Sequence, residues 1–313
     1  MCESVFKKYN MNIKNLKDYF FSELQTIQDV SEIESFFFIL TEYVHNLKRI
    51  DVSLNPDFEI TESYFNKWKT IISELKTEKP IQYITGEAWF YGLRFEVNEN
   101  TLIPRPETEE LVEWIVESQK SKVESQKLKV ENLKIQKSNN LTILDIGTGS
   151  GCIPIALKKE IPNANVSAID VSEKALEMAR KNALDNQVEV NFILQDILQS
   201  SNLQIFKSPN LLFDIIVSNP PYVRNLEKYE IKKNVLDYEP HLALFVDDTD
   251  ALLFYRKIAQ LALKSLVPNG KLFFEINQYL AKETVELLEQ LDFKNIELRK
   301  DFMGNDRMIC CNL

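Results

Sequence analysis

The stretch that decides the fold is Asp145-Ile146-Gly147-Thr148-Gly149-Ser150-Gly151, which follows the mainly apolar residues Leu141-Thr-Ile-Leu144. Only 7 of the 313 residues are glycine, and three of these seven fall within this stretch. Because glycine adopts backbone conformations that other residues avoid, such a turn lets a ligand approach the main chain closely. The spacing is G-x-G-x-G rather than G-x-G-x-x-G, which argues against a dinucleotide. The stretch therefore predicts a ligand-binding loop between a buried strand and a helix.

Around this loop, strands and helices alternate and predict the architecture of the main domain. We expect strands at 141–145, 166–169, 188–194, 213–218, 271–276, 295–299 and 308–311. Helices are expected at 152–160, 172–184, 250–266 and 281–291. Strands that are joined through helices make right-handed crossovers and form a doubly wound sheet. The fold class of this part of the chain is thus α/β.

Residues 1–80 predict a small helical-bundle domain. A first helix is expected at 12–27, a second opens with the capping box Ser31-x-x-Glu34, and Thr61 can cap a third. Apolar and aromatic residues recur in these helices with the helical period. They most simply form the core of the bundle, and a groove for a protein partner is the alternative.

The middle of the chain carries a linker and an insert. Segment 81–106 is expected to link the bundle to the main domain at 107–313 through a β-hairpin at 88–97. The main domain should begin with a helix at 107–117. The unit Val-Glu-Ser-Gln-Lys then occurs twice with a period of seven residues, within 116–139. Glutamine stands where a coiled coil needs apolar residues, so this insert is interpreted as a solvated helical extension or a flexible segment.

Charge and composition exclude several classes of function. The 37 basic and 47 acidic residues give a net charge of −10, which opposes direct binding to nucleic acid. With only two histidines, His45 and His241, and no CxxC motif, we expect no metal site and no Ser-His-Asp hydrolase. No apolar run reaches 18 residues, so no membrane association is expected. A cytoplasmic protein is the expectation.

Three acidic residues follow three successive predicted strands, namely Asp145, Asp170 and Asp196. Because the carboxyl ends of parallel strands meet at one edge of a sheet, these side chains should border one ligand site. A carboxylate at Asp170 can accept two hydrogen bonds from a ribose diol. Asp196 could accept a hydrogen bond from an adenine amino group, with Ile197 covering the ring.

The tetrapeptide Asn219-Pro220-Pro221-Tyr222 follows the fourth predicted strand. Consecutive prolines fix the loop and have no backbone N–H, so Pro220 can only accept hydrogen bonds. The Asn219 side-chain oxygen is a second acceptor, and Tyr222 offers a flat ring. Two acceptors beside an aromatic ring suit a planar NH2 group, either on an amide or on a base.

These motifs together resemble the HemK/PrmC family of S-adenosylmethionine-dependent protein-(glutamine-N5) methyltransferases, which modify peptide-chain release factors. The resemblance extends over nearly the whole chain. It rests on the glycine loop, the tetrapeptide, and the motifs Gln82-Tyr83-x-x-Gly86, Pro104-Arg-Pro-Glu-Thr-Glu109 and Glu239-Pro240. The resemblance implies a Rossmann-like, seven-stranded doubly wound sheet behind an N-terminal helical domain that docks the substrate protein. Asn277 and Ala251 stand where the family usually has glycine, and neither is expected to contact the site.

Residue by residue, the resemblance implies a site for S-adenosylmethionine and a site for glutamine. The loop from Gly147 to Gly151 would line the methionine end of the cofactor, with Asp170 at the ribose and Asp196 and Ile197 at the adenine. Asn219 would border the cofactor, and the tetrapeptide from Asn219 to Tyr222 would hold the substrate amide. Asn219 Oδ1 and the Pro220 carbonyl would each accept one amide hydrogen, and Tyr222 would pack on the amide plane.

Two other functions remain as alternatives. Adenine-N6 methyltransferases share the tetrapeptide, but they need base flipping and a basic surface that this acidic chain lacks. A non-catalytic, cofactor-binding scaffold is the second alternative. The preferred substrate is the glutamine of the Gly-Gly-Gln motif of release factors, because the two glycines would let that loop enter a narrow cleft.

Overall fold

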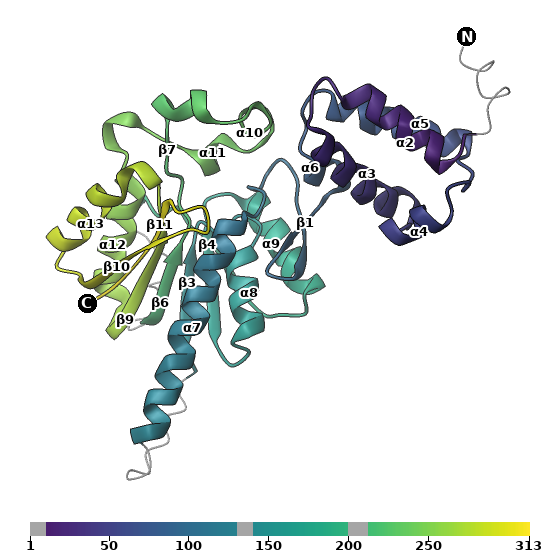
Figure 1. The fold of residues 1–313 in the computed structure, drawn as a ribbon. Helices are drawn as coiled ribbons and strands as arrows, with labels where there is room; N and C mark the ends of the chain where they lie inside the picture. The colour runs from purple at the N-terminus through teal and green to yellow at the C-terminus, as the bar shows by residue number, and fades with distance from the viewer. Residues whose placement is uncertain (1–10, 130–139, 200–211) are drawn as a thin grey trace. The chain divides into compact units, whose positions relative to one another are not determined.

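The computed structural model describes residues 11–129, 140–199 and 212–313, and these residues fall into two compact units (Figure 1). The first unit is Met1–Gly86 together with Lys233–Tyr238. The second unit is Glu87–Lys232 together with Glu239–Leu313. The segment 81–106 is therefore divided between the two units at Gly86. Residues 130–139, the second part of the repeat insert, lie outside the described residues.

The first unit is helical. Its helices are α2 (Ile13–Leu24), α3 (Val30–His45), α4 (Arg49–Leu54), α5 (Glu62–Leu75), α6 (Ile81–Thr85) and α10 (Lys233–Tyr238). The side chain of Thr61 caps α5 by accepting a hydrogen bond from the backbone N–H of Tyr64. The prediction that Ser31 opens α3 is wrong, because α3 begins at Val30 and Asp29 is its N-cap residue. Asp29 has the extended backbone of an N-cap, and aspartate is itself favoured there.

The aromatic face of these helices is the core of the first unit. Phe20, Phe37 and Trp68 are completely buried and contact one another, with ring centroids 5.5–5.6 Å apart. The indole N–H of Trp68 donates a hydrogen bond to His45 Nε2 at 2.9 Å. The buried indole is thus satisfied, and a histidine at the helix end serves packing rather than chemistry.

The second unit is built on a seven-stranded sheet, as expected. Its strands are β3 (Thr142–Ile146), β4 (Asn165–Asp170), β5 (Asn191–Leu194), β6 (Phe213–Ser218), β9 (Leu266–Glu275), β10 (Lys294–Lys300) and β11 (Asp306–Asn312). Their order in the sheet is β10-β11-β9-β6-β3-β4-β5. The five strands from β9 to β5 are parallel; beyond β9, β11 is antiparallel to β9, and the edge strand β10 is antiparallel to β11. The chain moves outward from β3 to β5 and then returns to β6 on the other side, so the order reverses between β3 and β6.

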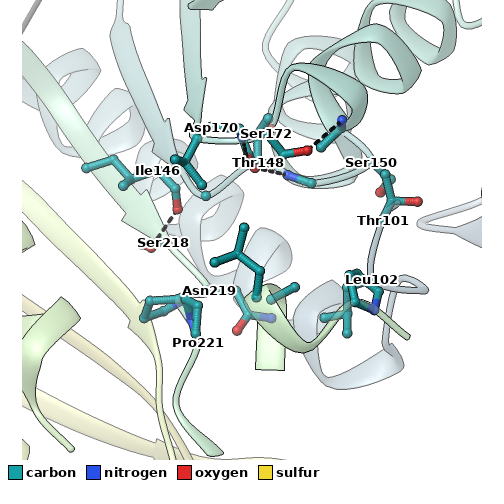
Figure 2. A pocket seen from close by; sticks show the side chains of 18 of the residues that line it. Thr101, Leu102, Ile146, Thr148, Ser150, Asp170, Ser172, Ser218, Asn219 and Pro221 are labelled. Carbon is teal, nitrogen blue, oxygen red and sulfur yellow. Dashed lines mark hydrogen bonds between the residues drawn. The ribbon is translucent and has the colours of Figure 1, made fainter. Parts of the chain in front are cut away.

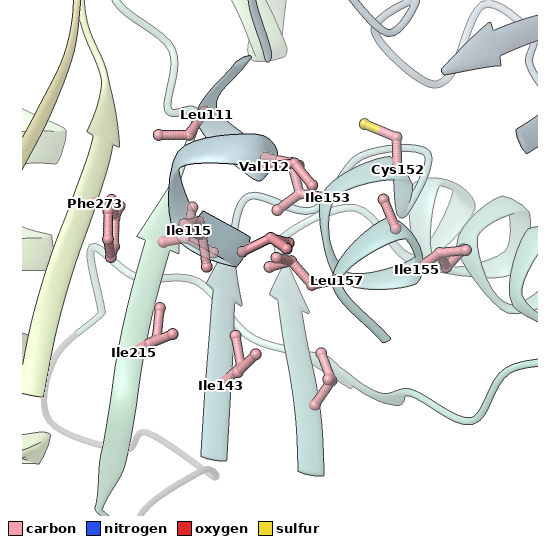
Figure 3. Close-up of a cluster of buried hydrophobic side chains, with 14 of the residues drawn as sticks. Leu111, Val112, Ile115, Ile143, Cys152, Ile153, Ile155, Leu157, Ile215 and Phe273 are labelled. Atoms are coloured by element: carbon pink, nitrogen blue, oxygen red, sulfur yellow. The ribbon is translucent and has the colours of Figure 1, made fainter. Parts of the chain in front are cut away.

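Helices cover both faces of this sheet. The covering helices are α7 (Pro106–Lys129), α8 (Cys152–Glu160), α9 (Glu173–Asp185), α12 (Leu253–Ser265) and α13 (Ala281–Gln290). Neighbouring residues of one strand face opposite cores: Ile143 packs under α7 and α8, whereas Leu144 packs under α12 and α13. Figure 3 shows α7 and α8 side chains, among them Leu111 and Ile153, above the strands that carry Ile143 and Ile215. The strands are apolar on both sides because both sides are covered.

Short elements surround this core. They are the hairpin β1 (Glu87–Phe90) and β2 (Leu93–Glu96), and a segment with β7 (Val223–Arg224), α11 (His241–Leu244) and β8 (Phe245–Val246). Helix α7 runs past its expected end at residue 117 and continues to Lys129, so the first part of the repeat insert is helical. Among the helices of the described residues, none combines the length and apolar character needed to cross a bilayer.

Candidate active site

A cavity of about 250 Å³ opens at the carboxyl ends of the parallel strands, where the strand order reverses between β3 and β6. Open α/β sheets bind their ligands at this kind of position. Figure 2 shows Thr148 and Asp170 on one side of the cavity and Asn219 and Pro221 on the other. The structure thus brings the glycine loop and the tetrapeptide together although they are about 70 residues apart in the sequence.

The glycine loop connects β3 to α8 through three residues with positive φ. The φ angles of Gly147, Gly149 and Gly151 are 77°, 55° and 82°. A Cβ at Gly149 would meet no atom within 4 Å, whereas a Cβ at Gly151 would lie 3.0 Å from Ala179 and from Ile155. Gly149 therefore leaves room at the cavity, and Gly151 permits close packing of α8. Accordingly, residues 147–150 line the cavity and Gly151 does not.

Asp170, the last residue of β4, holds the glycine loop in place. Its Oδ2 accepts a hydrogen bond from the Gly149 N–H at 2.8 Å, and its Oδ1 accepts one from the Ser172 N–H at 2.9 Å. Burial raises the pKa of this carboxyl group, and the backbone hydrogen bonds oppose that effect. Each oxygen keeps a further lone pair, so Asp170 can still accept hydrogen bonds from a ligand diol.

Asp196 and Ile197 also line the cavity, two to three residues beyond the end of β5. Asp196 Oδ1 accepts a hydrogen bond from the Leu198 N–H at 2.8 Å, which fixes the turn that follows the strand. The Gln195 N–H donates to the Asp170 carbonyl at 2.8 Å. These bonds keep the ends of β4 and β5 together beside the cavity.

The tetrapeptide is divided by the structure. Asn219, Pro220 and Pro221 line the cavity, and Tyr222 does not. The Tyr222 ring packs against the core beneath α12 and α13, and its hydroxyl donates to Glu275 Oε1 at 3.0 Å. Burial and the negative charge of Glu275 raise the pKa of Tyr222 far above its ordinary value, so the hydroxyl is a donor at any physiological pH. In this structure Tyr222 supports the loop from behind.

Asn277 corrects an expectation about the departures from the family pattern. It was expected to avoid the site, yet its Nδ2 donates to the Tyr222 carbonyl at 2.9 Å and to Glu227 Oε2 at 2.9 Å. Its φ of −65° also shows that no left-handed conformation is needed there. The side chain, which glycine lacks, ties the end of the tetrapeptide to the segment that follows β9.

The sequence predicted a linker up to residue 106 and a helix from 107, and it placed no residue of segment 99–108 in the site, yet several of these residues line the cavity. Glu239 holds this segment: it accepts a hydrogen bond from the Ile103 N–H at 3.2 Å and forms an ion pair with Arg105 at 2.5 Å. Glu239 is nearly fully buried, whereas a third of the Arg105 side chain is exposed. The two family motifs that contain Arg105 and Glu239 therefore meet in space. The presence of both motifs, one with a cation and one with an anion, was the signal in the sequence that could have indicated this contact.

Asp145 lies under the glycine loop with its side chain completely buried. Among the described residues neither carboxylate oxygen has a well-formed hydrogen bond, and the nearby Thr148 hydroxyl and Ile146 backbone offset only part of the cost of burial. Burial raises the pKa of Asp145 from 3.8 to about 7. A buried carboxylate with so little hydrogen bonding is costly to ionise, so it weakens the fold of the free protein.

This cost predicts that Asp145→Asn stabilises the ligand-free protein at high pH. Between pH 3.8 and 7 the folded state keeps a proton that the unfolded state releases, so the wild type loses stability as pH rises. The variant has no proton to lose at this position. Its stability relative to the wild type should therefore rise across this window, and the difference in Tm should reach the order of 5 °C at pH 8. Calorimetry at pH 4 and pH 8 measures it. Equal differences at both pH values would contradict the assignment.

The residues of the cavity fit S-adenosylmethionine. The cofactor carries a positive sulfonium, and three acidic residues, Glu99, Asp170 and Asp196, line the cavity against one cation, Arg105. The open position at Gly149 gives access to the main chain of the loop. An acidic wall beside a glycine turn suits a ligand with a cationic centre and a ribose.

Comparison with known proteins agrees with this geometry. The model of the PrmC N-terminal domain matches residues 20–86, and that of the methyltransferase small domain matches residues 118–241. The release factor glutamine methyltransferase of Flavobacterium psychrophilum is 59% identical over 302 residues, which cover 96% of this chain and 99% of that protein. The enzyme of the same name from Bacteroides thetaiotaomicron is 40% identical, over 94% of this chain and 98% of that protein. The one from Streptococcus pneumoniae is 38% identical, over 92% of this chain and 94% of that protein.

Similarity of this extent covers both units and the cavity between the glycine loop and the tetrapeptide. It confirms the expectations of a methyltransferase and of S-adenosylmethionine as its methyl donor. The chain belongs to the release factor glutamine methyltransferase family.

Proposed function

We propose that the protein methylates the side-chain amide nitrogen of the glutamine in the Gly-Gly-Gln motif of peptide-chain release factors. The observation that carries the proposal is that one cavity is lined by Asp170 on one side and by Asn219 and Pro220, which both carry acceptor oxygens, on the other. Relatives at 38–59% identity are named for this activity, which supports the assignment. The substrate is thus a protein side chain rather than a nucleic acid.

The chain's own residues would position the reacting amide. An amide nitrogen is a poor nucleophile, because its lone pair is delocalised into the carbonyl group. Asn219 Oδ1 and the Pro220 carbonyl each accept one amide hydrogen, which orients the NH2 group and favours charge developing on nitrogen. Holding reacting groups in this way contributes several kcal/mol. Methylation makes the nitrogen cationic and strongly acidic, so one of its two hydrogens then leaves as a proton to water.

The cofactor would be held by the opposite wall. Bound S-adenosylmethionine supplies an activated methyl group. The main chain of residues 147–150 would contact its methionine part, Asp170 its ribose, and Asp196 with Ile197 its adenine. Asp170 connects two tasks, since the carboxylate that binds the ribose also fixes the Gly149 N–H.

The first unit is proposed as the part that docks the release factor. The net charge of −10 disfavours nucleic acid as a direct partner. Exposed apolar side chains, among them Val30, Ile50 and Leu54, are available on its helices for a protein surface. A cytoplasmic location is part of this proposal, because translation takes place there.

Labelling with radioactive S-adenosylmethionine tests the proposed function. The enzyme should label purified release factor on one glutamine, and a release factor with Gln→Ala in the Gly-Gly-Gln motif should take up no label. Duplex DNA is the matched alternative substrate and should remain unlabelled. Label on DNA adenine, or on the altered release factor, would contradict the substrate assignment. Mass mapping of the labelled peptide identifies the modified atom.

A further inference from the structure

Behind Asn219 lies a chain of hydrogen bonds among buried polar side chains. Asn219 Nδ2 donates to Thr108 Oγ1 at 3.2 Å, and the Thr108 hydroxyl donates to Glu275 Oε2 at 2.6 Å. Tyr222 Oη donates to the other carboxylate oxygen of Glu275 at 3.0 Å. Thr108 and Glu275 are 2% and 1% exposed. Polar groups buried this deeply are costly to leave unpaired, so the chain of bonds constrains each of its members.

The number of hydrogens that each group carries decides which group donates and which accepts in these bonds. Burial raises the pKa of Glu275, while the hydrogen bonds from Thr108 and Tyr222 and the charge of Arg307 oppose this effect. In the structure Thr108 donates to Glu275 Oε2 and Tyr222 donates to Oε1, the arrangement of a carboxylate that accepts at both oxygens, so the single hydroxyl hydrogen of Thr108 points toward Glu275. Thr108 Oγ1 then has only lone pairs for Asn219, and only the NH2 end of the Asn219 amide can face it.

This direction matters because an asparagine amide has two ends of nearly equal shape. With NH2 toward Thr108, Oδ1 faces the other way, and no described residue donates a hydrogen bond to it. A reversed amide would present its own NH2 group to the substrate NH2 group. Two donors cannot bond to each other, so the reversed form could not hold the substrate.

We propose, on the basis of the function proposed above, that Thr108 and Glu275 are positioning residues that hold the Asn219 amide with Oδ1 toward the substrate glutamine. Glu275 does not line the cavity, and it acts on the reaction only through Thr108 and Tyr222. Its carboxylate joins the start of α7, the end of β9 and the tetrapeptide. Each of its two oxygens accepts one bond from a different segment, which is the reason that a carboxylate is needed there.

Three variants separate this role from simple packing. Thr108→Val keeps the side-chain shape but removes the hydroxyl group, so kcat should fall about 10- to 100-fold. Thr108→Ser keeps the hydroxyl group and should restore most of the turnover. Glu275→Gln has one acceptor and one donor end, so it cannot accept from both Thr108 and Tyr222, and it should lower kcat in the same way. The affinity for S-adenosylmethionine, measured by calorimetry, should change little, whereas the Tm should fall in Thr108→Val, because a buried oxygen of Glu275 loses its donor there.

A double-mutant cycle supplies the decisive readout. If Thr108 acts through Asn219, Thr108→Val should cause no further loss of kcat in an Asn219→Ala background. A full additional loss there, or near-normal kcat for both Thr108→Val and Glu275→Gln, would overturn the inference and leave the proposed function intact. Absence of glutamine methylation by the wild type, or full turnover by Asn219→Ala, would instead overturn the function or the role of the tetrapeptide, and the inference with it.

Neutron diffraction of the perdeuterated wild type gives a test that needs no variant. Two deuterium atoms on the Asn219 nitrogen facing Thr108, and the hydroxyl deuterium of Thr108 facing Glu275, are the expected result. A deuterium on Thr108 that points toward Asn219 would show the opposite amide orientation and overturn the proposal.

Discussion

Replacing Asn219 by alanine is expected to lower kcat by about 100-fold or more, the scale found when one preorganised hydrogen-bond partner of a transition state is removed. The variant loses Oδ1, the only side-chain acceptor that the tetrapeptide offers to the cavity. It should leave the affinity for S-adenosylmethionine nearly unchanged, because the glycine loop and Asp170 lie on the opposite wall. Single-turnover kinetics with saturating cofactor, together with calorimetric titration of the cofactor, separates the two effects.

Asn165→Ala is the matched control. Asn165 is an exposed asparagine at the start of β4, the end of the strand that is remote from the cavity. It should keep wild-type turnover and wild-type affinity. If Asn219→Ala turned over at a near-normal rate, the tetrapeptide would have only a structural role. If it lost cofactor affinity and turnover in equal measure, Asn219 would be a cofactor ligand rather than a substrate ligand.

Much of the site could be predicted because its parts are local in the sequence. The glycine loop, Asp170 and Asn219 each follow directly from a strand whose apolar run is plain in the sequence. Parallel strands that alternate with helices place their carboxyl ends at one edge. The alternation alone therefore predicts that these three motifs meet, without knowledge of the order of the strands.

The supporting contacts could not be predicted, because they depend on which strands are neighbours. Thr108 and Glu275 are 167 residues apart and meet only because α7 starts beside the end of β9. Tyr222 was expected to face the substrate, but its position is set by the Glu275 carboxylate behind it. Nothing in the local sequence distinguishes a tyrosine that faces a cavity from one that faces the core.

The first residue of α3 was predicted wrongly for a different reason. Ser31 and Glu34 have the residue types and spacing of a capping box, yet α3 begins at Val30. Asp29 and Ser31 are both favourable N-cap residues, and they lie within one turn of each other. The choice between them amounts to about 1 kcal/mol, so packing of the helix in its unit decides it.

Asp170→Ala is expected to weaken S-adenosylmethionine binding by about 10²- to 10⁴-fold, since two hydrogen bonds to a charged acceptor contribute about 1.5–3 kcal/mol each. The structure adds a second cause: without the carboxylate, the N–H groups of Gly149 and Ser172 lose their acceptor, and the loop that carries them is less constrained.

Asp170→Asn distinguishes the causes. Its single oxygen can accept from only one of these N–H groups, so it should bind the cofactor poorly although its shape is nearly unchanged. Asp185→Ala removes an exposed carboxylate from the end of α9 and should bind normally in the same calorimetric titration. Wild-type affinity in Asp170→Ala would remove this carboxylate from the cofactor site, and wild-type affinity in Asp170→Asn would show that its charge and second acceptor are not needed to hold the glycine loop.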